Sequence, residues 1–352
     1  MNKTALKHFR VFRFSSLGDI AMTVPVIRLL LQQHTGIRIT MVSNDFVRPL
    51  FKGIDRLEFY AVDKKGKHRG IKGMYRLFKE LETAGHVDGV ADLHDVLRTK
   101  LLRTFFYLKG NRVAVIDKGR KEKKELTRKK NKKLHPLKSN FLRYAGVFSN
   151  LGYPIKLNAQ NATIKLAVPG ELARLKDLGH VLIGIAPFAL HKEKTYPAEK
   201  MKQLIRLLSK NSKLKLFLIG GRDDAEELET WLPGADGVVS WAGKMDFQKE
   251  LNYISSLDLM VSMDSANMHL ASMFGVPVVS IWGGTHPYLG FYGWGQSPLN
   301  AVQVDLECRP SSVFGNKPCH NDLACMNMIS PIVIFEKIIR QLNLEHYEIS
   351  RN

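Results

Sequence analysis

The stretch LDLMVSMDSANMHLASMFGVPVVSIWGG, residues 257–284, contains the pattern that decides the fold. Two short apolar runs, 257–263 and 276–282, flank an amphipathic segment that begins at Asp264 and Ser265. Apolar runs of this length separated by a helical segment are typical of a βαβ unit, in which a helix joins two parallel strands. The stretch therefore predicts a parallel sheet covered by helices.

The same alternation extends over all 352 residues, of which 45% are hydrophobic. Further strands are predicted at 9–14, 37–42, 59–62, 87–93, 113–116, 181–186, 214–219 and 238–240. Turn formers collect between Gly152 and Gly179, where we place a domain boundary. Because a chain of this length buries two cores, we predict an α/β protein with two Rossmann-like domains whose parallel sheets face each other across a cleft.

Open α/β sheets bind ligands outside the carboxyl ends of their strands, so motifs that follow strands are the candidate site. The first is Ser15-Ser16-Leu17-Gly18-Asp19. The carboxylate of Asp19 either acts as a general base at the cleft mouth or only stabilises the N-terminus of the following helix through the helix dipole. Pro25 removes a backbone hydrogen bond from the following helix, which predicts a kink or an irregular first turn.

Two motifs of the second half suit a diphosphate. Lys194 lies in the loop HKEKTYP, residues 191–197, and is either a phosphate-neutralising group or one of several surface lysines. Asp264 and Ser265 are typical of a helix N-cap, which leaves backbone amides free for an anion. His269 follows about one and a half turns later and either reaches the same ligand or is a buried structural histidine.

The remaining motifs are weaker indications of a functional site. The glycine pairs 220–221 and 283–284 either let backbone approach a ligand or serve turn geometry. Neither matches the glycine-rich fingerprint of dehydrogenases or ATPases. The spacing of Cys308, Cys319 and Cys325 with His320 fits no paired zinc pattern, so packed thiols are expected.

The net charge is +20, and residues 98–143 contain 17 Lys/Arg against three acids, a net +14. Such a segment is either a solvated loop or a surface for nucleic acid, anionic lipid or a phosphorylated saccharide. We expect a cytoplasmic protein, because the sequence has few cysteines, no apolar run long enough to cross a bilayer and no signal-peptide core.

Taken in order, the motifs resemble the glycosyltransferase family that contains the ADP-heptose:lipopolysaccharide heptosyltransferases. The motifs that carry the resemblance are the 15–19 segment with Thr23-Val24-Pro25, Asp92-Leu93-His94 with Leu97-Arg98, Lys194-Thr195-Tyr196-Pro197, Ala242-Gly243-Lys244-Met245, Asp264-Ser265 with Met268-His269-Leu270-Ala271, Gly275-x-Pro277 and Gly284-Thr285-x-Pro287.

The resemblance implies a GT-B architecture. It divides the chain into an acceptor-binding domain at 1–165, a nucleotide-sugar-binding domain at 175–330 and a C-terminal helix at 331–352 that returns to the first domain. It further implies an inverting enzyme without metal or cofactor, which moves a heptose or related sugar from an ADP-sugar to the lipid A–core saccharide in lipopolysaccharide biosynthesis.

The resemblance also implies roles for single residues. Asp19 is the expected catalytic base. The expected donor-binding residues are Lys194, Met245, Asp264, Ser265, Ala266 and His269, and the expected acceptor-binding residues are Ser16, Gly18, Arg98, Lys100 and Arg120. Ala266 replaces the usual third-position glycine, and Ala189-Leu190 replaces hydroxyl residues of the phosphate loop, which leaves the donor sugar open.

The expected partners are a nucleotide-sugar donor such as ADP-heptose, a lipid-linked phosphorylated acceptor and the anionic inner face of the cytoplasmic membrane, with the chain acting as a monomer. Another GT-B sugar-nucleotide enzyme, such as a hexosyltransferase or an epimerase, is the main alternative. A nucleic-acid-binding protein is disfavoured because the basic tract has few interleaved aromatic residues and explains none of the motifs.

Overall fold

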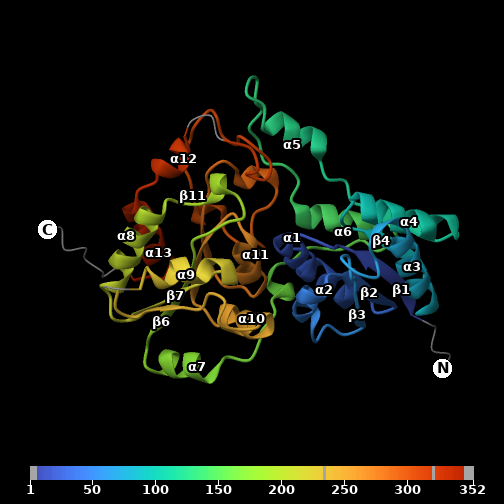
Figure 1. Cartoon of the computed structure of the whole chain (residues 1–352), viewed down its shortest axis with the longest axis horizontal. Coiled ribbons are helices and arrows are strands. Elements are labelled where there is room, and N and C mark those ends of the chain that lie inside the picture. The colour runs from blue at the N-terminus through green and yellow to red at the C-terminus, as the bar shows by residue number, and fades with distance from the viewer. Residues whose placement is uncertain (1–5, 233–234, 319–321, 345–352) are drawn as a thin grey trace. The chain divides into compact units, whose positions relative to one another are not determined.

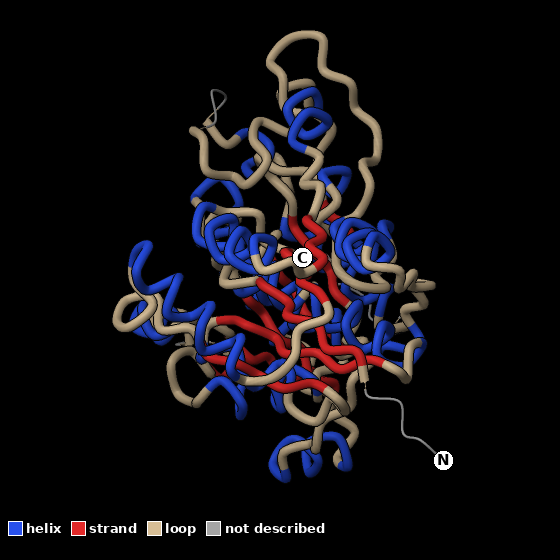
Figure 2. Tube along the Cα trace, turned by 90° about the vertical axis from the view of Figure 1, so that its right-hand side faces the viewer, coloured by secondary structure: helices blue, strands red, loops and turns tan. Residues whose placement is uncertain are grey.

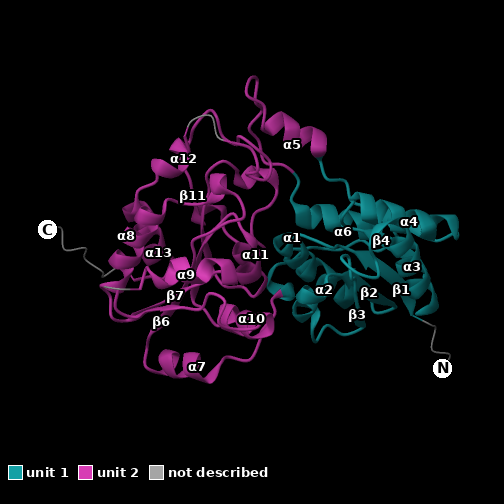
Figure 3. Ribbon diagram, in the orientation of Figure 1, with its two compact units in different colours: residues 1–119, 138–162 teal, residues 120–137, 163–352 magenta. Residues whose placement is uncertain are grey.

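The computed structural model describes residues 6–232, 235–318 and 322–344. The chain divides into two compact units (Figure 3). Unit 1 consists of the residues up to Gly119 together with Lys138–Ala162, and unit 2 of Arg120–Leu137 together with the residues from Thr163 onward. The division after Ala162 falls inside the stretch in which turn formers collect.

Unit 1 contains a sheet of five parallel strands in the order β3-β2-β1-β4-β5 (Figure 1). The strands are β1 (Lys7–Phe12), β2 (Ile37–Ser43), β3 (Leu57–Ala61), β4 (Gly89–Asp92) and β5 (Arg112–Val115). The helices are α1 (Leu17–Ala21), α2 (Thr23–Gln33), the 3-10 helix η1 (Asp45–Phe51), α3 (Gly70–Thr83), α4 (Leu97–Leu108) and α6 (Asn140–Asn150). All five strands predicted for this half are confirmed.

The helices of unit 1 cover both faces of its sheet. Strand connections move outward from β1 through β2 to β3 and then return to β4, and right-handed crossovers place the two sets of helices on opposite faces. α2 packs with α6, and α3 packs with α4 over a core that includes Phe12, Leu77, Phe78 and Phe106. The strands run inside, and the helices lie outside (Figure 2).

The irregular turn predicted around Pro25 is confirmed. α1 ends at Ala21 and α2 starts at Thr23, with Met22 between them. Pro25 occupies the first turn of α2, where the missing N–H has no partner within the helix anyway. The Thr23 hydroxyl donates to the Ile20 carbonyl at 2.7 Å and supports the break.

Unit 2 contains six parallel strands in the order β11-β10-β9-β6-β7-β8. The strands are β6 (Val181–Ala186), β7 (Leu214–Leu218), β8 (Val238–Ser240), β9 (Leu259–Met263), β10 (Val278–Ile281) and β11 (Ala301–Val302). The five predicted strands are confirmed, and the two-residue β11 was not predicted. The helices are α5 (Arg120–Leu126), α7 (Gly170–Asp177), α8 (Ala198–Ser209), α9 (Ala225–Glu229), α10 (Phe247–Ser255), α11 (Ala266–Met273), α12 (Ala324–Asn327) and α13 (Pro331–Gln341).

The most basic part of the chain belongs to unit 2, not to the N-terminal domain in which the expected boundaries placed it. Leu126, inside the basic segment 120–137, and Leu137, at its end, are buried in a cluster with Leu289. Lys123 is also buried, and its Nζ lies 4.1 Å from the ring centre of Phe291. Apolar residues that interrupt the charge run therefore attach this segment to unit 2.

The C-terminal helix also differs from expectation. α13 packs against α8 and β10, and four of its residues, Ile334, Phe335, Ile338 and Ile339, are buried in the core of unit 2. Its apolar face is thus used inside unit 2, whereas we expected the helix to return to the first domain. The expected segment continues to residue 352, and residues 345–352 lie outside the described part of the chain. Within the described residues, no helix combines the length and apolar character needed to cross a membrane.

Candidate active site

The carboxylate of Asp19 is held by two neighbours at the carboxyl end of β1. Arg13 Nη2 lies 2.6 Å from Asp19 Oδ2, and the Ser16 hydroxyl donates to the same oxygen at 2.8 Å. Ser16 is the N-cap residue of α1, but its side chain makes no capping bond and binds Asp19 instead. Asp19 is thus both a first-turn helix residue and an oriented, partly exposed carboxylate.

Arg13 was not among the predicted site residues. It follows β1 directly, is 6% exposed, and donates from Nη1 to the Leu93 carbonyl at 2.7 Å. Burial opposes its charge, but Tyr144 and Asp19 outweigh this effect and raise the pKa of Arg13. The sequence signal for Arg13 was an arginine next to an apolar run. An arginine that is buried with such a run usually has a charged partner, which here is Asp19.

The Asp92-Leu93-His94 motif stabilises the loop that follows β4. Asp92 is fully buried. Its carboxylate accepts hydrogen bonds from the backbone N–H groups of His94 and Asp95, both at 2.9 Å, and from Arg103 Nη1 at 2.7 Å. The backbone N–H of Phe14 donates to His94 Nδ1 at 3.3 Å, which joins this loop to the loop after β1. Burial, with Arg13 and Lys118 nearby, lowers the pKa of His94 to about 3. His94 therefore acts as a neutral hydrogen-bond acceptor at pH 7.

This arrangement predicts a pH dependence of stability. The unfolded chain protonates His94 near its usual pKa of 6.5, whereas the folded state resists protonation until about pH 3. The stabilisation by neutral His94 is therefore present above pH 6.5 and is lost as the pH falls, by about 1.4 kcal/mol per unit. Between pH 6.5 and 4.5, the free energy of urea unfolding should fall by about 2–3 kcal/mol more in the wild type than in His94→Asn. Parallel curves for the two proteins would contradict this role.

The expected acceptor-binding residues divide between the units. Ser16 is the N-cap of α1, Gly18 lies in its first turn, and Arg98 and Lys100 are exposed in the first turn of α4, all in unit 1. Arg120 begins α5 in unit 2.

Lysines from two other loops add to the cations of unit 1. Lys64, after β3, donates to the Phe14 carbonyl at 3.1 Å, and Lys118, after β5, donates to the Asp95 carbonyl at 3.1 Å. Burial, Arg98 and Lys65 lower the pKa of Lys64. The carboxyl edge of this sheet is therefore cationic.

In unit 2, the structure brings together Lys194, Asp264 and Thr285. Lys194 closes the short 3-10 helix η3 (Lys192–Lys194), Asp264 follows β9, and Thr285 lies in the loop after β10. Lys194 Nζ lies 3.2 Å from Asp264 Oδ2, and the Thr285 hydroxyl donates to the same oxygen at 2.8 Å. Asp264 and Thr285 are buried, and the Lys194 side chain is 15% exposed. The cluster presents a fixed cation at the carboxyl edge of the sheet.

The other expected donor residues lie along the same edge. Ser265 is the N-cap of α11, as predicted, and its side chain makes no capping bond. Ala266 starts α11, and His269 is buried in its second turn. Met245 lies half-buried in the loop between β8 and α10. The first amides of α11 thus follow directly after Asp264, where an anion is favoured.

Thr285 and Arg309 are supporting residues that the sequence did not single out as binding residues. The buried Arg309 donates to the carbonyls of Gly283 at 2.6 Å and Thr285 at 3.0 Å. It thereby holds the loop that carries the Thr285 hydroxyl. Arg309 is 24 residues from Thr285 along the chain, and no local motif connects them.

The glycines of this loop serve packing within the protein. A Cβ on Gly284 would lie 3.2 Å from the Glu193 carbonyl oxygen, and the Gly284 N–H donates to that oxygen at 2.9 Å. Gly315, in the left-handed region at φ +71°, leaves room for Lys194, since a Cβ would lie 2.4 Å from Lys194 Cγ. Of the two readings of the 283–284 pair, these contacts support turn and packing geometry.

The cysteines show no common site in the described residues. Cys325 is buried, as expected of a packed thiol, but Cys308 is exposed, so that expectation was wrong for Cys308. Cys319 and His320 lie outside the described part of the chain.

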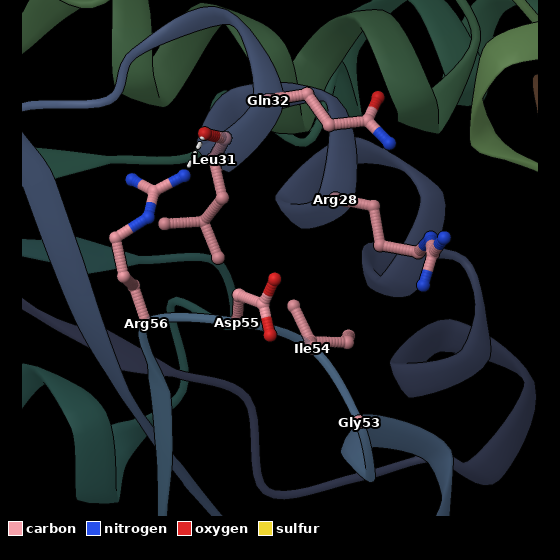
Figure 4. Close-up of a pocket in the computed structure, with 7 residues that line it drawn as sticks. All are labelled: Arg28, Leu31, Gln32, Gly53, Ile54, Asp55 and Arg56. Atoms are coloured by element: carbon pink, nitrogen blue, oxygen red, sulfur yellow. Dashed lines mark hydrogen bonds between the residues drawn. The ribbon is translucent and has the colours of Figure 1, made fainter.

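A pocket in unit 1 lies away from all these residues (Figure 4). It is lined by the C-terminal half of α2 and by the loop before β3, through Arg28, Leu31, Gln32 and Gly53–Arg56. This is the amino edge of the sheet, opposite Asp19. The Arg56 guanidinium donates to the carbonyls of Leu31, His34, Thr35 and Ile37 and closes the end of α2. The role of Arg56 is therefore structural.

Comparison with known proteins agrees with this geometry. The model of glycosyltransferase family 9 (heptosyltransferase) matches residues 74–317. Lipopolysaccharide heptosyltransferase 1 of Campylobacter coli is 23% identical over 298 residues, which cover 79% of this chain and 84% of that protein.

Two solved structures share the fold. The glycosyl transferase family 9 protein of Veillonella parvula DSM 2008 has a TM-score of 0.73 at 18% identity, with 97% of this chain and 99% of that chain covered. The E. coli heptosyltransferase WaaC with ADP has a TM-score of 0.67 at 19% identity, with 95% and 99% covered. The expected GT-B fold is confirmed. Because the family model spans well over half of the chain, the protein belongs to glycosyltransferase family 9, the heptosyltransferase family, and is a glycosyltransferase.

Proposed function

We propose that this enzyme transfers a heptose from an ADP-sugar to the lipid A–core saccharide during lipopolysaccharide synthesis, with inversion and without a metal ion. The observation that carries the proposal is the Lys194–Asp264–Thr285 cluster beside the start of α11. A fixed ammonium and free helix amides suit a diphosphate. The names of two relatives, a lipopolysaccharide heptosyltransferase and a heptosyltransferase with ADP, support the sugar, the nucleotide and the acceptor.

In this proposal, Asp19 takes the proton of the acceptor hydroxyl. The acceptor oxygen forms a bond to the anomeric carbon of the donor as the bond from that carbon to the diphosphate breaks. Direct displacement inverts the anomeric configuration. The proton stays on Asp19, and ADP leaves with the electron pair of the broken bond.

Stabilising the leaving diphosphate is the main electrostatic task. Lys194 and the first amides of α11 supply positive charge for it, and Asp264 holds Lys194 in place through Oδ2. Ser265, Ala266 and His269 line the diphosphate and sugar, and Met245 lies against the adenine. Positioned groups of this kind each contribute a few kcal/mol, about 3, to the transition state.

The acceptor is assigned to unit 1. Ser16 and Gly18 lie next to Asp19, and Arg98 and Lys100 provide cations for acceptor phosphates. Arg120, which begins α5 in unit 2, is kept in the proposal as a further acceptor-binding residue. The enzyme acts in the cytoplasm on an acceptor held in the inner membrane, and it works as a monomer.

A donor panel tests the proposal. ADP release should require both ADP-heptose and a heptose-deficient lipopolysaccharide, and UDP- and GDP-sugars should support little turnover. Faster turnover with another nucleotide sugar, or conversion of a donor in the absence of acceptor, would instead favour a hexosyltransferase or an epimerase.

A further inference from the structure

Two neighbouring helices of unit 1 present an unusual outer surface. α3 and α4 pack side by side on one face of the sheet (Figure 1). The Tyr75 ring lies 5.4 Å from the Phe105 ring, in an edge-to-face contact that joins the two helices near the surface. The two helices therefore form one continuous structural face, which we call the α3–α4 face.

Large apolar side chains on these helices remain exposed. Ile71 is 71% exposed, Tyr75 is 49% exposed, and Leu97 is 83% exposed. Ile71 and Tyr75 are four residues apart and so lie on the same side of α3. Ile71 and Leu97 both lie in the first turn of their helix. Scattered single apolar residues are normal, but this grouping on packed helices marks an interaction surface.

The same face is strongly basic. α4 contains no acidic residue, and α3 contains none before Glu80. Lys72 and Arg76 flank Ile71 and Tyr75, are exposed, and take part in none of the ion pairs found among the described residues. Glu80 itself is bound by the Lys67 ammonium and the His68 ring. Around Ile71 and Tyr75, the positive charge of the α3–α4 face is thus uncompensated among the described residues. On α4, Lys100 lies 3.9 Å from Asp95, and Arg103 binds Asp92 and Asp95.

From this combination, we propose that the α3–α4 face docks the enzyme on an anionic lipid bilayer. Exposed aliphatic and aromatic residues that alternate with lysine and arginine characterise helices lying in the membrane interface. Each basic residue near an anionic surface strengthens binding about fivefold, and the apolar side chains add their burial in the headgroup region. A second copy of the same face would bring equal positive charges together, which disfavours self-association.

The proposal deepens the proposed function, on which its choice of a lipid partner rests. Ile71 and Leu97 begin helices that follow the carboxyl ends of β3 and β4, and Asp19 lies after the carboxyl end of β1 in the same sheet. A bilayer on the α3–α4 face therefore lies beside the loops to which we assign the acceptor. Docking would raise the local concentration of a lipid-linked acceptor at these loops.

Vesicle flotation with the full chain tests the proposal. The wild type should bind phosphatidylcholine vesicles that contain about 30% phosphatidylglycerol, should bind pure phosphatidylcholine vesicles weakly, and should lose binding steeply as salt rises. Ile71→Ser with Leu97→Ser should weaken partitioning at least about tenfold, because two exposed apolar side chains no longer enter the interface. Lys72→Glu with Arg76→Glu should weaken it by a similar or larger factor.

Matched variants in unit 2 are the controls. Leu178→Ser with Leu299→Ser removes two leucines that are 74% and 78% exposed, and Lys210→Glu with Lys213→Glu makes the same charge change on an exposed surface. Both control pairs should bind vesicles like the wild type. All variants should keep wild-type turnover with a deacylated, water-soluble acceptor.

Three results would overturn the proposal. The first is equal vesicle binding by the α3–α4 variants and their controls, and the second is the absence of a preference for anionic lipid. The third is a concentration-dependent dimer that the α3–α4 substitutions abolish while vesicle binding persists. Vesicle binding does not require turnover, so it decides the docking proposal even if the enzyme proves inactive on the proposed acceptor.

Discussion

Replacing Asp19 with asparagine is expected to lower kcat by about 10²- to 10⁴-fold while leaving the Kd for ADP unchanged. Asparagine keeps the shape of the side chain and the hydrogen bond from Ser16, but it has no basic carboxylate to accept the acceptor proton. ADP binds to residues of unit 2 in the proposed mechanism, so donor affinity should not depend on Asp19. Steady-state ADP release and calorimetry with ADP measure the two quantities.

A matched control is Asp45→Asn, which removes an exposed carboxylate of unit 1 whose ion-pair partner among the described residues is Arg48, three positions along the chain. It should retain full turnover. Because the buried Arg13 loses its charged partner in the Asp19 variant, thermal unfolding is the check that unit 1 remains folded. A folded Asp19→Asn enzyme with wild-type kcat would rule out the base assignment.

Replacing Lys194 with alanine is expected to raise the Kd for ADP by about 10- to 100-fold and to lower kcat further, because charge-assisted hydrogen bonds are worth about 1.5–3 kcal/mol. The substitution removes the ammonium that lies 3.2 Å from Asp264 Oδ2. It also leaves the carboxylate of Asp264 unneutralised next to the incoming diphosphate, which adds repulsion. Calorimetry with ADP gives the affinity, and steady-state assays give the change in turnover.

Lys192→Ala is the natural control, because Lys192 belongs to the same short helix η3 but is exposed and forms no ion pair among the described residues. It should change the Kd for ADP less than about twofold, since solvent and salt screen an exposed charge. An unchanged ADP affinity in Lys194→Ala, or an equal loss in both variants, would remove Lys194 from the diphosphate site.

The strands were predictable because each is a short apolar run bounded by turn residues, and a buried parallel strand needs little else. β10 and β9, for instance, lie within the two apolar runs at 276–282 and 257–263. β11 was missed because two residues, Ala301 and Val302, are too few to show any periodicity. The break before α2 was predictable from Pro25 alone, because proline acts locally.

The site was predictable only in part. Asp19, Lys194 and Asp264 stand in motifs directly after strands, where the topology of an open sheet places ligands. Two supporting residues, Arg13 and Arg309, do not. Arg13 precedes its motif inside an apolar run, and Arg309 reaches the carbonyls of Gly283 and Thr285 from a distant loop. Hydrogen bonds of that kind depend on the path of the chain in three dimensions.

The sequence by itself determined the class of fold, the ten longer strands and the loops that carry the candidate catalytic groups, because these follow from the hydrophobic pattern and residue chemistry of short segments. Only the tertiary structure decided that Arg13 and Ser16 hold Asp19, that Thr285 shares Asp264 with Lys194, and that residues 120–137 and α13 belong to unit 2. An apolar residue such as Leu126 or Ile338 signals that it will be buried, but the surface that buries it is a long-range property of the folded chain.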